Sequence, residues 1–267
     1  MIAGRETFRL AALALRRNKL RSFLTALGII IGVAAVICMV SIGEGAKSRI
    51  RGMIESAGTN VLLVMSGSSS SGGMRGGMGS QPTITWEDLR ALQTELPLVR
   101  AASPQPRINS EVVAESATWS TTIYGTLPEY FVIRSWAVAQ GATFTDSDQA
   151  GGAKNAVIGQ STAEKLFGAG VDPVGQVVRI RNAPFTIIGV LEKKGQSGMG
   201  QDQDDGVFVP LSAFQARMQR GLGKFVPGPI YVSAVASDSI DLAKDSIAQL
   251  LRDRIGSWPV KKTISRS

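Results

Sequence analysis

The stretch SFLTALGIIIGVAAVICMVSIG, residues 22–43, contains no acidic or basic side chain, which sets it apart from the remainder of the chain. An α-helix rises about 1.5 Å per residue, so about 20 apolar residues cross the ~30 Å hydrocarbon core of a bilayer. A cleaved signal peptide is the competing interpretation. Its apolar core is shorter, roughly 7–15 residues, and the residues after this stretch offer a poor cleavage site. The sequence therefore predicts one transmembrane helix over residues 22–43.

Basic side chains gather directly before this helix, at Arg16, Arg17, Lys19 and Arg21. A basic cluster beside a span tends to remain in the cytoplasm, so these residues predict a cytoplasmic N-terminus and an external remainder. Residues 1–21 carry +5 of the net charge of +8, which is typical of orientation and of contact with membrane lipid, and not of nucleic-acid binding. Because residues 5–20 show helical periodicity, we expect residues 1–21 to form a cytoplasmic amphipathic segment.

Gly28 and Gly32 lie four residues apart within the predicted span. Small residues at this spacing let two membrane helices approach closely, which predicts a helix-packing role for the pair. Glycine is common in membrane helices, so the alternative of no special role stays open. Cys38 is the only cysteine, which excludes an internal disulfide, and we interpret it as a thiol within the membrane helix.

The composition excludes several kinds of enzyme. The chain contains no histidine, which excludes Ser-His-Asp and Cys-His catalysis and most catalytic zinc sites. It also lacks the P-loop pattern that holds ATP phosphates, so no catalytic, cofactor or metal site is predicted. The sequence therefore predicts a protein that is not an enzyme.

Two polar motifs in the second half of the chain have structural interpretations. Gly159-Gln160-Ser161 is superficially like a nucleophile elbow, but we interpret Ser161 as a helix N-cap paired with Glu164 in a capping box. The acidic run QDQDDG, residues 201–206, is interpreted as a solvated surface loop that contains Asp202, Asp204 and Asp205.

Residues 44–256 alternate predicted strands and helices without a dinucleotide-binding fingerprint. Residues 44–57 are expected to extend the membrane helix as a polar stalk, and the Gly/Ser-rich residues 66–81 to form a flexible loop. Thr85 is the expected N-cap of a helix over 86–96. The other expected elements are a helical turn at 128–131, helices at 161–167, 210–220 and 239–255, and strands at 61–65, 107–114, 118–126, 156–159, 177–181, 185–191, 206–209 and 230–235. This pattern predicts an α+β extracytoplasmic domain with more than one lobe.

Several segments of the chain together resemble one family. The segments NKLRSFLTALGIIIGV (18–33), GEGA (43–46), GTN (58–60), AVIGQSTAEKLFG, DPVGQVVRI and FTIIGVLEKKG are similar to MacB-type ABC transporter permeases of the FtsX-like group. The resemblance covers about residues 5–256. It implies a two-lobed periplasmic domain on the inner membrane, a partner ATPase that binds ATP, a homo- or heterodimer with another permease chain, and mechanical coupling across the membrane. It leaves open whether a periplasmic adaptor and an outer-membrane channel take part.

Residues 257–267 depart from that family. Members continue with three further membrane helices, whereas this tail is basic and lacks a long apolar run, so we expect a truncated or frameshifted permease. The leading hypothesis is a permease subunit, or a fragment of one, of an efflux-type ABC transporter that couples ATP hydrolysis by a partner to motions of the periplasmic domain. The alternative is a single-span periplasmic binding or adaptor protein without transport activity.

Overall fold

The computed structural model describes residues 19–57, 60–67, 70–71, 74–75, 83–115, 117–197, 200–219, 223–255 and 264–266. The chain divides into two compact units, Met1–Gly52 and Met53–Ser267. The boundary lies within one long helix, so we describe that helix first and the second unit separately.

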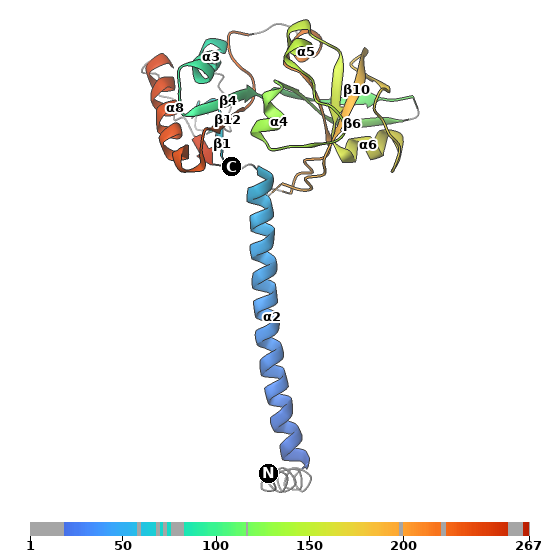
Figure 1. Cartoon of the computed structure of the whole chain (residues 1–267), viewed down its shortest axis with the longest axis vertical. Coiled ribbons are helices and arrows are strands. Elements are labelled where there is room, and N and C mark those ends of the chain that lie inside the picture. Colours follow the sequence, from blue (N-terminus) through green and yellow to red (C-terminus); the bar gives the residue numbers. More distant parts are fainter. Residues whose placement is uncertain are drawn as a thin grey trace, which may run out of the picture. The chain divides into compact units, whose positions relative to one another are not determined.

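Helix α2, Lys19–Ala57, is continuous (Figure 1). Its 39 residues make it about 58 Å long at a rise of about 1.5 Å per residue. The part Phe23–Gly45 has a mean hydropathy of 2.7, which makes it long and apolar enough to cross a bilayer. Its large apolar side chains are exposed, as expected for a helix whose natural surroundings are lipid. The prediction of one apolar N-terminal helix is confirmed, and the range predicted as a stalk, 44–57, continues the same helix.

The first lobe of the second unit, which we call the small lobe, is built on an antiparallel sheet of order β13-β1-β12-β4. Helices α3 and α8 flank this sheet (Figure 1) and contribute apolar side chains to the same core as the strands. The elements of the small lobe are β1 (Val61–Val64), α3 (Trp86–Thr94), β4 (Val99–Pro104), β12 (Ile230–Ala234), the 3-10 turn η1 (Ser237–Ser239), α8 (Ile240–Ile255) and β13 (Ile264–Arg266).

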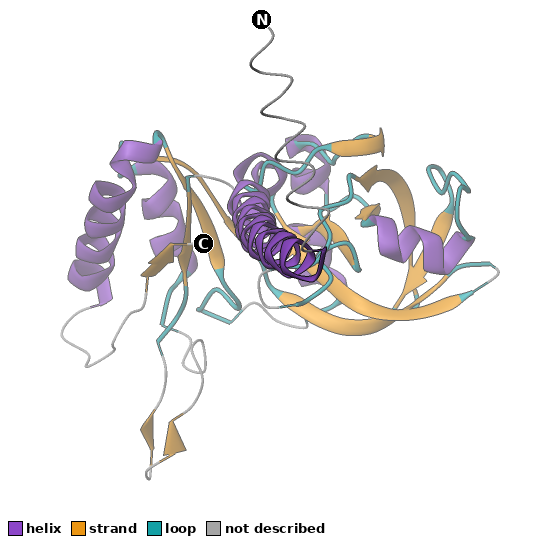
Figure 2. Cartoon of the chain, turned by 90° about the horizontal axis from the view of Figure 1, so that it is seen from below, coloured by secondary structure: helices purple, strands orange, loops and turns teal. Residues whose placement is uncertain are grey.

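The second lobe, residues 107–219, is inserted between β4 and β12, and we call it the barrel lobe. Its sheet has the order β7-β10-β8-β11-β6-β5-β9, and β9 also pairs with β10. Six strands therefore form a closed ring, with β7 added at β10, and their strong curvature is visible in Figure 2. Its elements are β5 (Arg107–Val113), β6 (Thr118–Thr126), α4 (Glu129–Ile133), β7 (Val138–Gly141), α5 (Asp146–Gly151), β8 (Asn155–Ile158), α6 (Gln160–Phe167), β9 (Val177–Ile180), β10 (Ala183–Leu191), β11 (Gly206–Pro210) and α7 (Leu211–Arg217).

Two apolar clusters stabilise the barrel lobe. The ring of strands encloses a core of aliphatic residues with Phe185 and Phe214. A second cluster is aromatic and joins α4 to β11, with Phe208 stacked on Tyr124 and edge-on to Trp136. Together with the sheet and core of the small lobe, these clusters confirm the predicted α+β class.

Two local predictions can be compared directly with the structure. Thr85 caps α3 as predicted: its hydroxyl accepts from the backbone N of Asp88, and the Asp88 carboxylate accepts from the backbone N of Thr85. The capping prediction for Ser161 is wrong, because α6 begins at Gln160 with Gly159 as its N-cap. The Ser161 hydroxyl instead donates to Asp202, 2.8 Å away.

The structure describes only part of the range predicted as a flexible loop, 66–81, and its flexibility stays a prediction. Ser66 and Gly67 are buried beside β1. The two-residue strands β2 (Ser70–Ser71) and β3 (Met74–Arg75) pair antiparallel. The remaining residues of this range, and most of the tail 257–267, lie outside the described residues.

Candidate functional site

The residues predicted to orient the membrane helix lie at or before the start of α2. Lys19 is the first described residue and is exposed, and Arg21 lies within the first turn. Arg16 and Arg17 lie outside the described residues. Their role in orientation stays a prediction.

Gly28 and Gly32 share one face of α2, since residues four apart on a helix are neighbours. A Cβ atom added to either glycine would meet nothing within 4 Å. The surface at this pair is therefore open to a second helix, and packing there stays a prediction. Cys38 is exposed on the same helix.

The prediction of a solvated surface is wrong for Asp204 and Asp205 of loop 192–205, which we call the Asp-rich loop, whereas Asp202 is exposed as predicted. Asp204 is fully buried. Its two carboxylate oxygens accept from the backbone N of Lys194 at 2.7 Å and of Gly195 at 2.8 Å. A buried carboxylate needs such donors, and the turn supplies them from its own backbone.

Asp205 joins the Asp-rich loop to the barrel. One of its oxygens accepts from Trp119 Nε1 at 3.0 Å, Thr121 Oγ1 at 2.7 Å and Thr162 Oγ1 at 3.0 Å. These donors come from β6 and α6, so a single carboxylate connects three segments. Among the described residues, no group of three or more Asp, Glu, Cys or His side chains is arranged to hold a metal ion. The acidic run is a structural anchor.

Lys194 lies at the base of the Asp-rich loop and is half-buried. Its Nζ donates to the backbone carbonyl of Arg134 at 2.5 Å and lies 5.2 Å from the centre of the Trp136 ring. Burial and the positive charge of Arg134 together lower the pKa of Lys194 to about 8, against the opposing effect of Asp204. The lysine therefore connects the Asp-rich loop to the segment that follows α4.

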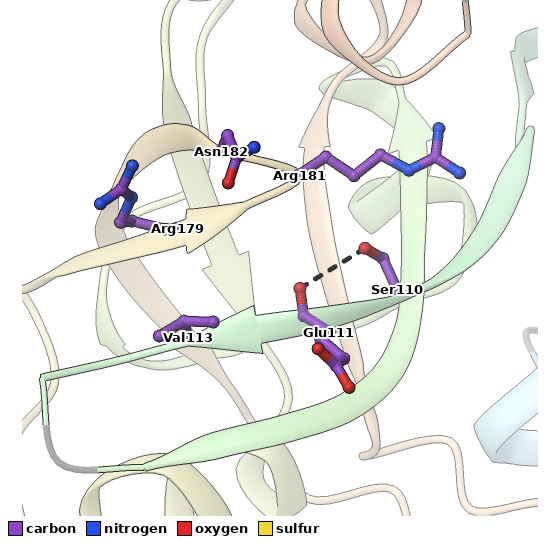
Figure 3. Close-up of a pocket in the computed structure, with 6 residues that line it drawn as sticks. All are labelled: Ser110, Glu111, Val113, Arg179, Arg181 and Asn182. Atoms are coloured by element: carbon purple, nitrogen blue, oxygen red, sulfur yellow. Dashed lines mark hydrogen bonds between the residues drawn. The ribbon is translucent and has the colours of Figure 1, made fainter.

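A hollow of about 370 Å³ opens at the rim of the barrel lobe beside β5 and β9 (Figure 3). Arg181 donates through Nη1 to the carbonyl of Met218, 2.8 Å away. The charged ends of Arg179 and Glu111 point away from each other in Figure 3. Binding sites for small molecules usually present polar groups that converge, so we do not assign this hollow as a ligand site. It is lined by Ser110, Glu111, Val113, Arg179, Arg181 and Asn182.

Comparison with known proteins gives a consistent result. The family model described as "MacB-like periplasmic core domain" matches residues 22–250. The macrolide export ATP-binding/permease protein MacB of Syntrophobacter fumaroxidans is 44% identical over 215 residues, which are 80% of this chain and 30% of that protein. MacB of an Azoarcus species is 41% identical over 251 residues, 94% of this chain and 37% of that protein. The pyoverdine export ATP-binding/permease protein PvdT of Pseudomonas entomophila is 34% identical over 239 residues, 89% of this chain and 35% of that protein.

Solved structures show the same fold. The periplasmic region of MacB from Actinobacillus actinomycetemcomitans matches with a TM-score of 0.65 at 21% identity, over 79% of this chain and 91% of that one. The extracellular domain of the noncanonic ABC-type transporter YknZ from Gram-positive bacteria matches with a TM-score of 0.60 at 22% identity, over 78% of this chain and 100% of that one. The chain spans about a third of the length of the curated relatives it matches. On the family model and these identities, the chain belongs to the MacB-like periplasmic core domain family.

Proposed function

We propose that this chain is a permease subunit, or part of one, of an efflux-type ABC transporter. ATP is hydrolysed by a partner ATPase on the cytoplasmic side of the inner membrane, and the resulting motion of α2 is passed to the extracytoplasmic domain. The chain itself holds no ATP and catalyses no reaction. A second permease chain packs against α2 at Gly28 and Gly32.

The family and the apolar helix α2 make this an extracytoplasmic domain with a membrane anchor. The proposed orientation follows from the basic residues before the span, which tend to stay in the cytoplasm. The related proteins are named for exporting macrolides and pyoverdine. From these names we infer export as the general activity. We infer no substrate, because the two named substrates are chemically different.

The observation that carries the proposal is the continuity of α2. The helix is about 58 Å long, against a hydrocarbon core of ~30 Å, so it extends well beyond the membrane. Only residues 58–60 separate its end at Ala57 from β1. β1 is a buried strand that pairs with β12 through four residues. Under this proposal, a tilt or shift of α2 would reach the sheet of the small lobe along this short covalent connection.

Co-purification from solubilised membranes tests the proposal. The full chain, tagged and expressed at its natural level in its own host, should enrich an ABC ATPase subunit over an untagged control. Recovery of extracytoplasmic proteins without any ATPase would contradict it and favour the alternative, a single-span binding or adaptor protein. That alternative is supported by the presence of one apolar helix within the described part of the chain.

A further inference from the structure

The chain passes between the two lobes twice, from β4 to β5 and from α7 to β12, and backbone bonds flank the first of these crossings. Gln105, between β4 and β5, donates its backbone N–H to the carbonyl of Pro229, which precedes β12, at 2.8 Å. Gly125 donates to the carbonyl of Pro106 at 2.9 Å. Gly228 has φ +79°, and a Cβ there would lie 2.6 Å from the Gln105 carbonyl oxygen, so this close approach requires glycine. These bonds extend the β4–β12 ladder of the small lobe and the β5–β6 ladder of the barrel lobe up to the crossing between β4 and β5.

A buried polar contact lies beside these crossings. Ser103 of β4 and Thr126 of β6 are both fully buried, and their hydroxyl oxygens are 2.9 Å apart. The Ser103 hydroxyl also accepts from the backbone N of Leu127 at 3.1 Å. Separating the lobes would exchange these contacts for contacts with water, so they add a modest free energy to the interlobe surface.

Tyr231 makes the main aromatic contact between the lobes. It lies on β12 of the small lobe, and its ring packs edge-on against Tyr130 of α4, with centroids 5.4 Å apart. Tyr130 is itself buried in the aromatic cluster of the barrel lobe, where it stacks on Phe208. The guanidinium carbon of Arg134 lies 5.5 Å from the centre of the Tyr231 ring, within cation–π range.

The Asp-rich loop holds Arg134 in this position. Arg134 Nη2 donates to Gln203 Oε1 at 2.8 Å, and the Arg134 carbonyl accepts from Lys194 Nζ. Gln203 and Lys194 both belong to the Asp-rich loop, whose base is fixed by the buried Asp204. The acidic anchor of the barrel lobe therefore extends to a side chain that touches the small lobe.

We propose that Tyr231, Tyr130 and Arg134 form an interlobe contact that makes the small lobe and the barrel lobe move as one rigid body. Under this proposal, a displacement that reaches β1 and β12 carries the barrel lobe with it, and the domain has no hinge between β4 and β5. The rigidity is a property of the domain, and its use in export rests on the proposed function.

Hydrogen–deuterium exchange of the full chain in detergent tests the interlobe contact. The slowest amides of α8 report on the small lobe and those of β8 on the barrel lobe. If the two lobes of the wild type open together, the slowest α8 amides and the slowest β8 amides exchange through the same global unfolding. Their protection factors should then agree within about threefold. In Tyr231→Ala we expect the exchange rates of the α8 and β8 amides to differ by at least about tenfold, because the two lobes then open separately.

Two variants at the same strand serve as controls. Val232→Ala removes the neighbouring side chain on the opposite face of β12, in the core of the small lobe, so it should speed both sets of amides by the same factor. Tyr231→Phe retains the ring and should behave as the wild type. Should Tyr231→Ala not fold, Tyr231→Leu keeps most of the volume but removes the aromatic contacts, and the same tenfold difference is expected.

Two outcomes would overturn the proposal. One is independent exchange of α8 and β8 already in the wild type, which would mean that the lobes are not coupled. The other is an equal acceleration of both in Tyr231→Ala, which would mean that the coupling does not depend on this contact. Neither result depends on an ATPase, so failure of this test and failure of the proposed transport role are distinguishable.

Discussion

The buried carboxylate of Asp204 offers the sharpest test of how the barrel lobe is built. Asp204→Ala removes the acceptor for the backbone N–H groups of Lys194 and Gly195, which are 2.7 and 2.8 Å from its oxygens. Asp204 is fully buried, so water has little access to replace the lost acceptor. The two amides would then be left without partners in the base of the Asp-rich loop.

The expected loss follows from these contacts. Each buried donor left unsatisfied costs about 1–3 kcal/mol, which gives about 2–6 kcal/mol for Asp204→Ala. The lower half of this range is expected, because Lys194 is only half-buried and local relaxation admits some water. Asp204→Asn keeps one acceptor oxygen and loses one, so it should cost about 1–3 kcal/mol.

Urea unfolding of the full chain in mild detergent at pH 7, followed by tryptophan fluorescence, measures these losses. The matched control is Asp172→Asn, since Asp172 is an exposed carboxylate that accepts from the backbone N of Val174. It should change the free energy of unfolding by less than about 0.5 kcal/mol. If Asp204→Ala were no more costly than this control, the carboxylate would not be an anchor and the reasoning would be wrong.

Three further predictions use the same preparations. A Cβ on Gly159 would collide with the backbone carbonyl oxygen of Asp204, so Gly159→Ala should lower the free energy of unfolding by about 2 kcal/mol or more. Gly151→Ala is the control, because a Cβ at that position meets nothing within 4 Å. Equal urea midpoints for the two variants would contradict this prediction. Burial depresses the pKa of Lys194 to about 8 from 10.5, so the unfolded chain binds more protons between these values, and the free energy of unfolding should rise with pH across this window. Lys194→Met should remove that rise, and an unchanged pH profile would show that Lys194 is not its source. Gly28→Ile and Gly32→Ile should each weaken self-association of the chain by about 1 kcal/mol, as measured by cross-linking in native membranes. Gly43→Ile serves as the control. If Gly28→Ile and Gly32→Ile leave association unchanged, the two glycines have no packing role.

The elements that the sequence predicted correctly are those with a local physical signal. The charge-free run at 22–43 specifies an apolar helix without reference to any other residue. The Thr85–Asp88 capping box acts across three residues, and the helix begins where it predicts. β6 was predicted over 118–126 from its threonine and aromatic content, and it has those bounds.

The elements that were missed depend on contacts between distant segments. β4 and β7 carry little alternation in their sequence, and their pairing with β12 and β10 defines them as strands. α5 did carry a signal, a capping box between Thr145 and Asp148, that could have identified it. The closure of the ring through β9 and β10 is a property of the whole lobe.

The acidic loop was misinterpreted for a related reason. Three aspartates within four residues are typical of solvent-exposed surface, and only the folded backbone determines whether donors face them. In this chain the donors of Asp204 lie about ten residues earlier, and those of Asp205 come from β6 and α6. The prediction at Ser161 is wrong for a similar reason: α6 begins one residue earlier, at Gln160, and the Ser161 hydroxyl donates to Asp202 of the distant acidic run.

The proposed mechanical coupling would pass through contacts of different kinds. From α2 to β1 the connection is covalent and short, and from β1 to β12 it is a ladder of four residue pairs. Both are insensitive to most side-chain changes, because backbone atoms make them. Between β12 and the barrel lobe the connection changes to side chains, with Tyr231 against Tyr130 and Arg134. Because a single substitution can alter this last step without removing a strand, Tyr231 is the residue at which the proposed rigidity can be tested, and the Asp-rich loop stabilises the surface that this residue meets.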